Sequence, residues 1–464
     1  MNTSRTTSGE WAPLPVLLAG AFMVVLDFFI VNVALPSISS DLGAGQSSLE
    51  WVVSGYGLTF AVLLIAAGRL GEQLGQRRVY GFGLGFFTLA SAACGLAPTA
   101  GFLIAARVAQ GAAGAVLMPQ VLGIVGRTYQ GEKRVRALGA YGIALGLAAV
   151  GGQVLGGGLL TADVANLGWR LCFLVNVPVG IVALALTPRL VPDHGRERRT
   201  RLDLLGTVAL AGGLVAILLP LIDGRQSGWP LWTWLSLAAA PVVVAGFALH
   251  QLRLQRAGGN PVFDLRLLRN RSFSAGLLTQ LALASSQAAF FVYLAIYLQN
   301  GRGLSPLAAG LTFAAVAATY VAVSGKATAL AQRHGRAVVG AGGAALVLGF
   351  LLIAAGVDAV GSSGTVALLV PGLAVAGAGI GLSFTPLTSI VLSGVDPERS
   401  GAAAGVLSTT QQIGNAIGVA VTGVIFFARP HDIAGAFSTS LLQLAACSAA
   451  IVFLARLLPG GRRA

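Results

Sequence analysis

One carboxylate, Asp27, stands in the middle of the apolar stretch MVVLDFFIVNVALP at residues 23–36. A charge near the centre of a lipid bilayer costs about 2.5–3.5 kcal/mol on insertion scales, so an acid at such a position faces protein or water and is functional by default. An acid removed from water also binds a proton more readily than an exposed acid. We therefore predict that Asp27 binds a proton and also contacts a ligand; a structural ion pair is the alternative.

A buried cation is the expected partner of this acid, and Arg107 is the candidate. If the apolar stretch around Asp27 rises from the cytoplasm and the one around Arg107 descends from outside, both residues lie about 8–10 Å below the same edge of a ~30 Å hydrocarbon layer. The two side chains can then interact directly or through a water molecule. The alternative is an arginine bonded to backbone carbonyls that reaches the outer surface.

Neutral polar and aromatic side chains mark a second candidate site. Gln280 and Gln287 are seven residues apart, and Gln411 and Asn415 are four apart, so each pair shares one face of a helix. Amides facing lipid are costly, so these side chains either line a cavity or bond between helices. Aromatic walls suit a large amphiphilic ligand. The candidate cavity residues are Asn32, Tyr56, Phe60, Gln110, Gln280, Gln287, Tyr293, Gln411 and Asn415.

The composition around these residues is that of an integral membrane protein. Hydrophobic residues make up 55% of the 464 residues, charged residues make up 10%, and the mean hydropathy is +0.81. Soluble domains carry about 25% charged residues. The 64 glycines suit helices that pack closely in a bilayer. The formal charge of +14 is spread between apolar stretches rather than over one basic surface, so no nucleic-acid partner is expected.

Windows of about 20 apolar residues, the length of a helix that crosses a bilayer, divide the chain into predicted spans. The fourteen spans cover residues 14–35, 51–70, 79–97, 102–126, 137–161, 171–188, 204–222, 232–252, 273–298, 307–327, 337–356, 365–392, 402–427 and 435–458. Arginine and lysine are concentrated in alternate connections, so the positive-inside rule places both termini in the cytoplasm. The first span is too long for a signal-peptide core, and we expect it to be retained.

Two short internal repeats in the sequence predict that the chain consists of two related halves. The basic turns GRLGEQLGQRRV and LAQRHGRAVV follow the second and tenth spans, and the pair Gly114 and Pro119 recurs at nearly the same offset as Gly381 and Pro386. The predicted divisions are a cytoplasmic tail at 1–13, a six-helix bundle at 14–188, a loop and two extra helices at 189–252, a linker at 253–272, a second six-helix bundle at 273–458 and a tail at 459–464.

Five stretches together resemble the major facilitator superfamily, in particular its fourteen-span drug:proton antiporter family of the EmrB/QacA type. They are LDFFIVNVALP at 26–36, GRLGEQLGQRR at 68–78, RVAQGAAGA at 107–115, GGQVLGGGLL at 151–160 and WRLCFLVNVPVG at 169–180. The resemblance covers essentially the whole chain and implies an all-α polytopic membrane fold of two six-helix bundles plus two additional helices. It also implies that Arg107 takes part in proton coupling and that the glycines of the fifth span mark export rather than uptake.

Two of these stretches are predicted to control conformational change. Glu72 and Arg77 are expected to latch the cytoplasmic face through charge pairing and helix-end contacts, with a solvated turn as the alternative. The glycines of the fifth span permit close contact or bending, with ordinary packing as the alternative. The gating candidates are Gly68, Glu72, Gly75, Arg77, Gly152, Gln153, Gly156 and Gly157.

The chain departs from the family pattern at three places. Glu72 and Gln73 stand where the cytoplasmic turn usually carries Asp and Arg. Gln153 stands where the fifth span usually carries proline, so no argument from a proline kink applies. The last six spans contain no acid, which disfavours a dicationic substrate.

The leading interpretation is a proton-coupled antiporter that exports lipophilic or amphiphilic drugs or antibiotics across a bacterial inner membrane by alternating access. Export of an endogenous metabolite, or an uncoupled channel or receptor, is the alternative. An enzyme is not expected, because Gly325–Lys326 lacks the rest of a phosphate loop. The three cysteines lie in apolar runs, so we expect no disulfide, metal or cofactor. The expected molecule is a monomer whose partners are a small-molecule substrate, protons and the lipid bilayer.

Overall fold

The computed structural model describes residues 10–195, 203–224, 227–259, 265–360, 364–393, 400–429 and 432–458. These parts consist of α-helices with a few short 3-10 and π-helical turns, and they contain no β-strand. Helices are expected of apolar stretches in lipid, because a helix satisfies its backbone hydrogen bonds within one segment. The all-α prediction is confirmed for the described residues. Most of the predicted tail at 1–13 and the whole tail at 459–464 lie outside them.

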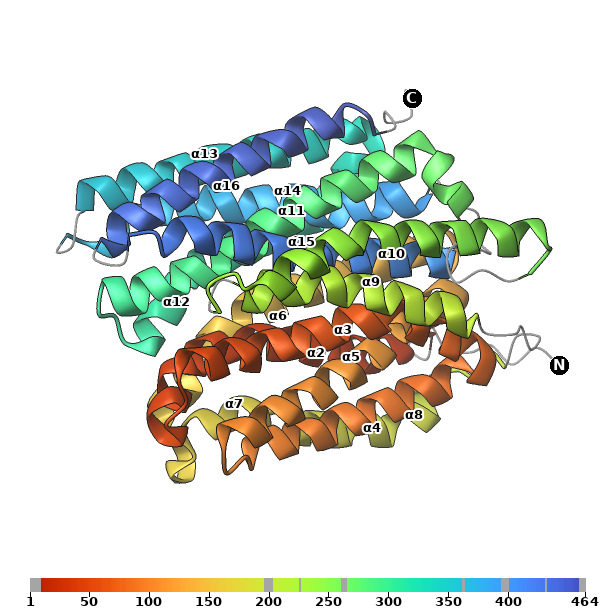
Figure 1. Cartoon of the computed structure of the whole chain (residues 1–464), viewed down its shortest axis with the longest axis horizontal. Helices are drawn as coiled ribbons and strands as arrows, with labels where there is room; N and C mark the ends of the chain where they lie inside the picture. The colour runs from red at the N-terminus through yellow and green to blue at the C-terminus, as the bar shows by residue number, and fades with distance from the viewer. Residues whose placement is uncertain are drawn as a thin grey trace.

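The first group of helices forms the bundle drawn in red to yellow in Figure 1. It consists of α2 (Pro13–Leu42), α3 (Gln46–Leu74), α4 (Gln76–Gly95), α5 (Ala100–Thr128), α6 (Gly131–Ala162), α7 (Leu171–Leu174) and α8 (Asn176–Leu190). The 3-10 turns η1 (Val164–Asn166) and η2 (Gly168–Arg170) join α6 to α7.

The second group forms the bundle drawn in green to blue in Figure 1. It consists of α11 (Arg271–Ile296), α12 (Pro306–His334), α13 (Arg336–Val360), α14 (Val370–Ser393), α15 (Ser400–Phe426) and α16 (Ile433–Ala455). The turns η3 (Leu265–Arg269), η4 (Tyr297–Gly301) and η5 (Val366–Leu369) flank α11 and precede α14. The helix α2 begins and α16 ends at the same end of the molecule (Figure 1).

Two further helices, α9 (Leu204–Asp223) and α10 (Leu231–Arg256), lie between the bundles in the chain and over their junction in space (Figure 1). The helix α9 packs on α3 of the first bundle and on α15 of the second, while α10 packs mainly on α9. The two bundles themselves meet through α6 against α12 and α3 against α15. The junction is therefore bordered by helices that contact both halves.

An α-helix overlaps each predicted span. By length and composition, ten helices of the described chain can cross a membrane, and Trp51–Leu64 and Leu205–Leu221 are shorter apolar helices. The chain is thus a multi-pass membrane protein by these criteria, whereas the number of fourteen crossings and the cytoplasmic position of the termini stay predictions.

Candidate functional site

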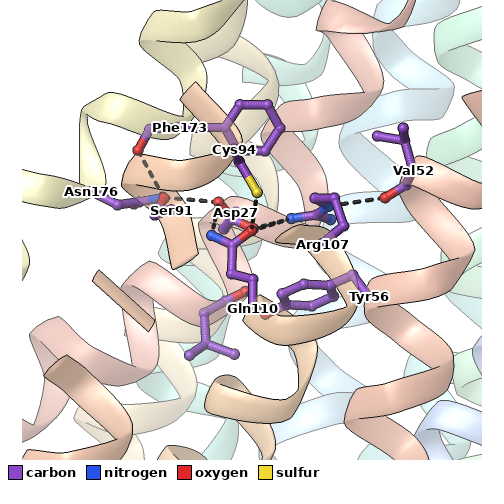
Figure 2. A network of polar contacts seen from close by, with 10 residues as sticks. Asp27, Val52, Tyr56, Ser91, Cys94, Arg107, Gln110, Phe173 and Asn176 are labelled. Carbon is purple, nitrogen blue, oxygen red and sulfur yellow. Dashed lines mark hydrogen bonds and ion pairs between the residues drawn. The ribbon is translucent and has the colours of Figure 1, made fainter. Parts of the chain in front are cut away.

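Asp27 lies in the middle of α2, and its carboxylate is fully buried. Nη1 of Arg107, on α5, forms an ion pair with Oδ2 of this carboxylate. The Nε2 group of Gln110 donates a hydrogen bond to Oδ1 at 2.8 Å, and Nδ2 of Asn176 donates to the same oxygen at 2.9 Å. Figure 2 shows these donors converging on Asp27 from α5 and α8. The contact predicted between Asp27 and Arg107 is present and direct.

The guanidinium of Arg107 bonds and packs against protein groups. Its Nε donates to the carbonyl oxygen of Val52 at 2.9 Å, and Nη1 donates to Oε1 of Gln110 at 2.9 Å. The carbon Cζ lies 4.3 Å from the ring centroid of Tyr56, within the range of a cation–π contact. Since the side chain is fully buried, the alternative of an arginine that reaches the outer surface is wrong.

Asn176 is the member of this cluster that the sequence analysis missed. It opens α8, and its Nδ2 also donates to Oγ of Ser91 at 3.1 Å, while that hydroxyl donates to the carbonyl oxygen of Phe173 at 2.9 Å. A second missed contact runs from Sγ of Cys94 to Oε1 of Gln110 at 3.4 Å. Asn176 was visible as an amide in an otherwise apolar run, FLVNVPVG, the same signal that marked Gln280 and Gln411.

A cavity of about 480 Å³ lies between the two bundles. Its walls come from α2, α3, the start of α4, α5 and α6 on one side and from α11, α12, α14 and α15 on the other. The aromatic part of the lining consists of Phe28, Phe29, Tyr56, Phe60, Tyr141, Tyr320 and Phe384, and the amides are Gln76, Gln280, Gln287, Gln411, Gln412 and Asn415. The cavity extends to the end of the molecule where α5 ends and α6 begins, since Arg127 and Arg134 also line it.

Most of the predicted cavity residues line this space, namely Tyr56, Phe60, Gln280, Gln287, Gln411 and Asn415. Three do not. Gln110 is bound to Asp27, and the Tyr293 hydroxyl donates to the carbonyl oxygen of Val419 at 2.8 Å, so both side chains point to neighbouring helices. Asn32 is buried beyond the closed end of the cavity, which reaches no further along α2 than Phe29. The lining of this cavity therefore does not include these three residues.

Tyr56 separates the cavity from the ion pair. Its ring lines the cavity and also contacts the guanidinium of Arg107, and its hydroxyl donates to the carbonyl oxygen of Val24 at 2.9 Å. Neither Asp27 nor Arg107 lines the cavity. A direct contact between Asp27 and a ligand therefore stays a prediction.

The glycines of α6 bring two other helices close to it. A Cβ atom at Gly152 would lie 3.2 Å from the backbone nitrogen of Ile30, and one at Gly156 would lie 2.9 Å from the Ile30 side chain, so both glycines face α2. A Cβ at Gly157 would lie 2.6 Å from the carbonyl oxygen of Pro306, at the start of α12. Because larger side chains would force these backbones apart, the glycines permit tight contact within one bundle and across the junction.

Gln153 of α6 and Gly310 of α12 lie in the same close-packed region as these glycines. Nε2 of Gln153 donates to the carbonyl oxygen of Phe29 at 3.4 Å. A Cβ on Gly310 of α12 would lie 2.7 Å from the carbonyl oxygen of Gln153. This part of the α6–α12 contact lies on the Phe29 side of the cavity, opposite the end lined by Arg127 and Arg134, and the contact continues along the cavity where the Tyr320 hydroxyl donates to the carbonyl oxygen of Gly142 at 2.7 Å.

The turn between α3 and α4 forms an ion pair with the segment just after α8. Gly75 joins the two helices with φ +95°, a conformation that glycine adopts without strain. Nη2 of Arg77 lies 2.9 Å from Oδ2 of Asp193, just after α8, so this ion pair lies within the first bundle. The side chain of Glu72 lies outside the described residues, and its pairing stays a prediction. Gly68 packs on Pro119, where a Cβ would make an ordinary contact of 3.7 Å.

Metal ligation finds no support in the part of the chain that the structure describes. Those residues contain no group of three or more His, Cys, Asp or Glu side chains arranged to hold a metal ion. The site that the structure shows combines a buried acid, its arginine and a mixed aromatic and amide cavity.

Comparison with known proteins finds one matching family and several similar transport or export proteins. The sequence profile of the Major Facilitator Superfamily matches residues 17–419. The chain is 37% identical to the probable actinorhodin transporter of Streptomyces coelicolor, over 90% of this chain and 72% of that protein. It is 36% identical to the cephamycin export protein CmcT of Amycolatopsis lactamdurans, over 98% and 94% of the two chains. It is 32% identical to the tetracenomycin C resistance and export protein of Streptomyces glaucescens, over 91% and 77%.

Solved structures show the same fold at low sequence identity. The human organic anion transporter MFSD10 (TETRAN) superposes with a TM-score of 0.68 at 17% identity, covering 96% of this chain and 99% of that one. The proton:xylose symporter XylE superposes with a TM-score of 0.68 at 13% identity, covering 98% and 97%. At these identities the likeness concerns the fold alone.

Proposed function

The chain belongs to the major facilitator superfamily, and from this premise we propose that it is a proton-coupled antiporter of the fourteen-span EmrB/QacA type. It exports amphiphilic antibiotics or drugs across the bacterial cytoplasmic membrane by alternating access. Its similarity is to transporters rather than enzymes, and the named relatives include export and resistance proteins for antibiotics, among them a puromycin resistance protein of Streptomyces alboniger. The pair α9 and α10 between the bundles supports the fourteen-span assignment.

The observation that carries the proposal is the fully buried pair of Asp27 and Arg107 beside a cavity at the junction of the bundles. The pair is neutral as a whole, and this offsets much of the cost of burying each charge. When Asp27 takes up a proton, the guanidinium loses its counter-charge and must find water or another partner. Protonation therefore favours a different arrangement of α2, α5 and α8, which is the requirement for coupling a proton to a conformational change.

Tyr56 supplies the connection between ligand and proton. A compound in the cavity contacts one side of the Tyr56 ring, and Arg107 contacts the same ring from behind. A ligand that moves the ring changes the position of the guanidinium and with it the affinity of Asp27 for a proton. Because such coupling is reciprocal, proton binding changes the affinity for the ligand by the same factor, about 5- to 150-fold in typical systems.

The positions of the cavity and of the α6–α12 contact support alternating access. The cavity reaches the end that holds Arg127 and Arg134, the predicted cytoplasmic side, while Gly157 and Gly310 hold α6 and α12 together on the other side. In this arrangement a compound enters from the cytoplasm. Rocking of the bundles about the junction then opens the α6–α12 contact and releases the compound outside.

The test is transport in inverted membrane vesicles, with puromycin, tetracenomycin C and a cephamycin as probes. Vesicles with the wild-type chain are acidified inside, and addition of a transported probe is expected to release protons and to accumulate the probe. The variant Asp27→Asn is expected to do neither, because its side chain cannot exchange a proton. Asp358→Asn, an exposed acid at the end of α13, is the control. Uphill transport by Asp27→Asn at the wild-type rate would overturn the proposal.

A further inference from the structure

The cavity has an aromatic wall on the side of the first bundle. Four rings on α2 and α3 line this side, namely Phe28, Phe29, Tyr56 and Phe60. The planes of the Tyr56 and Phe60 rings are 11° apart with centroids at 6.1 Å, and the Phe28 centroid lies 5.9 Å from that of Tyr56. Neighbouring rings of this kind offer a flat aromatic ligand both apolar area and favourable ring contacts. The wall therefore suits the face of a ring system.

The wall on the second bundle carries amides, two of them on α11. Gln280, Gln287 and Phe291 follow one another at intervals of seven and four residues, so they lie along one stripe of this helix. The Phe291 ring meets the Phe29 ring of α2, with centroids 5.5 Å apart. Because this contact shows that the stripe is directed at α2, the two amides that line the cavity face the aromatic wall.

Gln280 is an amide whose hydrogen bonding is incomplete. Its side chain is 1% exposed, and its Oε1 has no hydrogen-bond partner among the described residues. In contrast, Oε1 of Gln412 accepts a hydrogen bond from Nδ2 of Asn415 at 3.0 Å. A buried polar atom is normally paired, and leaving one unpaired costs free energy. Since Gln280 borders the cavity, its missing partner is a donor that enters this space, either water or a group of a ligand.

The hydroxyl groups near Gln280 on α11 already have acceptors. The Thr279 hydroxyl donates to a backbone carbonyl one turn earlier at 2.7 Å, and the Ser285 hydroxyl donates to the carbonyl oxygen of Gly414 at 2.9 Å. The helices α11 and α15 also pack closely here, since a Cβ at Gly414 would lie 2.7 Å from the carbonyl oxygen of Leu281. The position of the Gln280 amide is therefore fixed by packing, which favours selective recognition.

We propose that Gln280 determines specificity by accepting a hydrogen bond from a hydroxyl or amide N–H group on the edge of a flat polycyclic ligand, whose ring face lies on the aromatic wall. The inference rests on the proposed export function and specifies its substrate class. Gln280 and Gln287 are about 10 Å apart along the helix, comparable to the length of a fused tricyclic system. A ligand with an ether or alkyl group at the edge would leave Oε1 of Gln280 buried and unpaired.

The test uses three neutral probes that share one ring system: an anthraquinone carrying a hydroxymethyl, a methoxymethyl or an ethyl group at the same position. The second probe keeps the oxygen but has no proton to donate, and the third has neither. Binding to the purified full-length protein is measured by calorimetry. The hydroxymethyl probe is expected to bind about five- to tenfold more tightly than each of the other two.

The variant Gln280→Met removes the acceptor and keeps a side chain of similar length. It is expected to abolish the preference for the hydroxymethyl probe and to leave the affinity for the ethyl probe within about twofold of wild type. Gln443→Met is the matched control, because Gln443 lies on α16 outside the cavity lining, where its Oε1 accepts from the Thr422 hydroxyl at 2.8 Å. This control should keep the preference.

Thermal unfolding of the ligand-free protein in detergent gives a second readout. Gln443→Met leaves the buried Thr422 hydroxyl without its acceptor and should lower the unfolding temperature. Gln280→Met removes an atom that has no protein partner, so it should unfold at or above the wild-type temperature. A fall as large as that of Gln443→Met would show that the Gln280 amide is already paired, and the inference would fail.

The binding results can also contradict the inference. Equal affinity for the hydroxymethyl and methoxymethyl probes, binding of none of the probes, or a preference that survives in Gln280→Met would each overturn it.

The outcomes for the two proposals are distinguishable. If the hydroxymethyl probe is preferred through Gln280 but Asp27→Asn transports it uphill as well as the wild type, the antiport proposal fails and the subsite stands. If the three probes bind equally and their export still requires Asp27, the subsite fails and the antiport proposal stands.

Discussion

Asp27 and Asp203 are both held by donors from neighbouring helices, but Asp27 lies in the middle of its helix and Asp203 at the start of one. Asp27 is fully buried within α2 and is paired with Arg107. Asp203 caps α9: its carboxylate accepts from the backbone nitrogen of Gly206 at 2.8 Å and from Nε2 of Gln251 at 2.7 Å. Nε2 of His250, on α10, lies 2.8 Å from the same carboxylate, and the His250 side chain is 30% exposed.

The difference shows that location, and not the number of donors, decides what an aspartate does. At the end of α9 the acid satisfies a backbone group at a helix start and ties α10 to α9 through Gln251 and the partly exposed His250. Inside the bundle the carboxylate is paired with a fully buried cation, so a change in charge at Asp27 or Arg107 leaves an unpaired buried charge that movement of helices must relieve. The Asp203 cluster stabilises the packing of α9 against α10, whereas the Asp27 cluster is suited to couple protonation to conformation.

The largest effect is expected from removing the cation of the buried cluster. Arg107→Gln leaves an unpaired carboxylate inside the membrane, which costs about 3–5 kcal/mol in typical buried pairs. We expect loss of coupled transport and a clear fall in the thermal unfolding temperature in detergent. Asp27→Asn combined with Arg107→Gln removes both charges and should regain most of that temperature without regaining transport. If the double variant is as unstable as Arg107→Gln, the pair is not the source of the loss.

A smaller effect on folding, but a large one on coupling, is expected at Tyr56. Tyr56→Leu removes the ring that contacts both the cavity and Arg107, whereas Tyr56→Phe loses only the hydroxyl bond to Val24. The leucine variant should still bind ligand weakly but release few protons when it does, and the phenylalanine variant should stay near wild type. Ligand-induced proton release from the purified protein measures this. Equal proton release per bound ligand in both variants would show that the ring carries no coupling.

An intermediate effect is expected at Asn176, which links α8 to the acid. Asn176→Ala removes a hydrogen bond to a charged group, worth about 1.5–3 kcal/mol. We expect slower transport and a displaced pH profile, whereas an effect on stability alone would leave the profile in place. Thr187→Ala is the control, since its hydroxyl bonds only the carbonyl of Ala183 within α8. A pH profile that coincides with that of the wild type would exclude Asn176 from positioning the carboxylate.

The smallest effect is expected at Asp203. Burial by itself raises the pKa of Asp203, but hydrogen bonds from Gly206, His250 and Gln251 together lower it below the usual value. A carboxyl group whose pKa is lower in the folded chain than in the unfolded chain stabilises the fold fully at pH values above its unfolded pKa, about 3.9. This contribution is lost as the pH falls through the pKa that the group has in the folded chain.

Asp203→Asn keeps a side-chain oxygen for the cap but loses the charge that its donors stabilise. It should therefore reduce the free energy of unfolding at neutral pH by about 1 kcal/mol, and the difference from wild type should shrink in acid. Transport should stay at the wild-type level. A transport defect as severe as that of Arg107→Gln would erase the distinction between the two clusters.

The buried cluster was partly predictable from sequence. Asp27 and Arg107 are charges in apolar stretches, and the rise of a helix fixes their depth, so their meeting followed from simple geometry. Asn176 escaped because an amide gives a weaker signal than a charge, and nothing in the sequence fixes the rotation of α8 toward α2. Asn32 and Tyr293 failed for a related reason, since helical spacing tells which residues share a face but not which neighbour that face meets.

The sequence by itself determined that this chain forms apolar helices with a few polar groups held away from lipid. Length, hydropathy and the need to satisfy backbone hydrogen bonds within each segment are local properties. Only the tertiary structure decided that Arg77 pairs with Asp193 and that Tyr56 lies between the cavity and Arg107. These relations join residues far apart in the chain, and they depend on how packed helices are rotated against one another, which no single segment encodes.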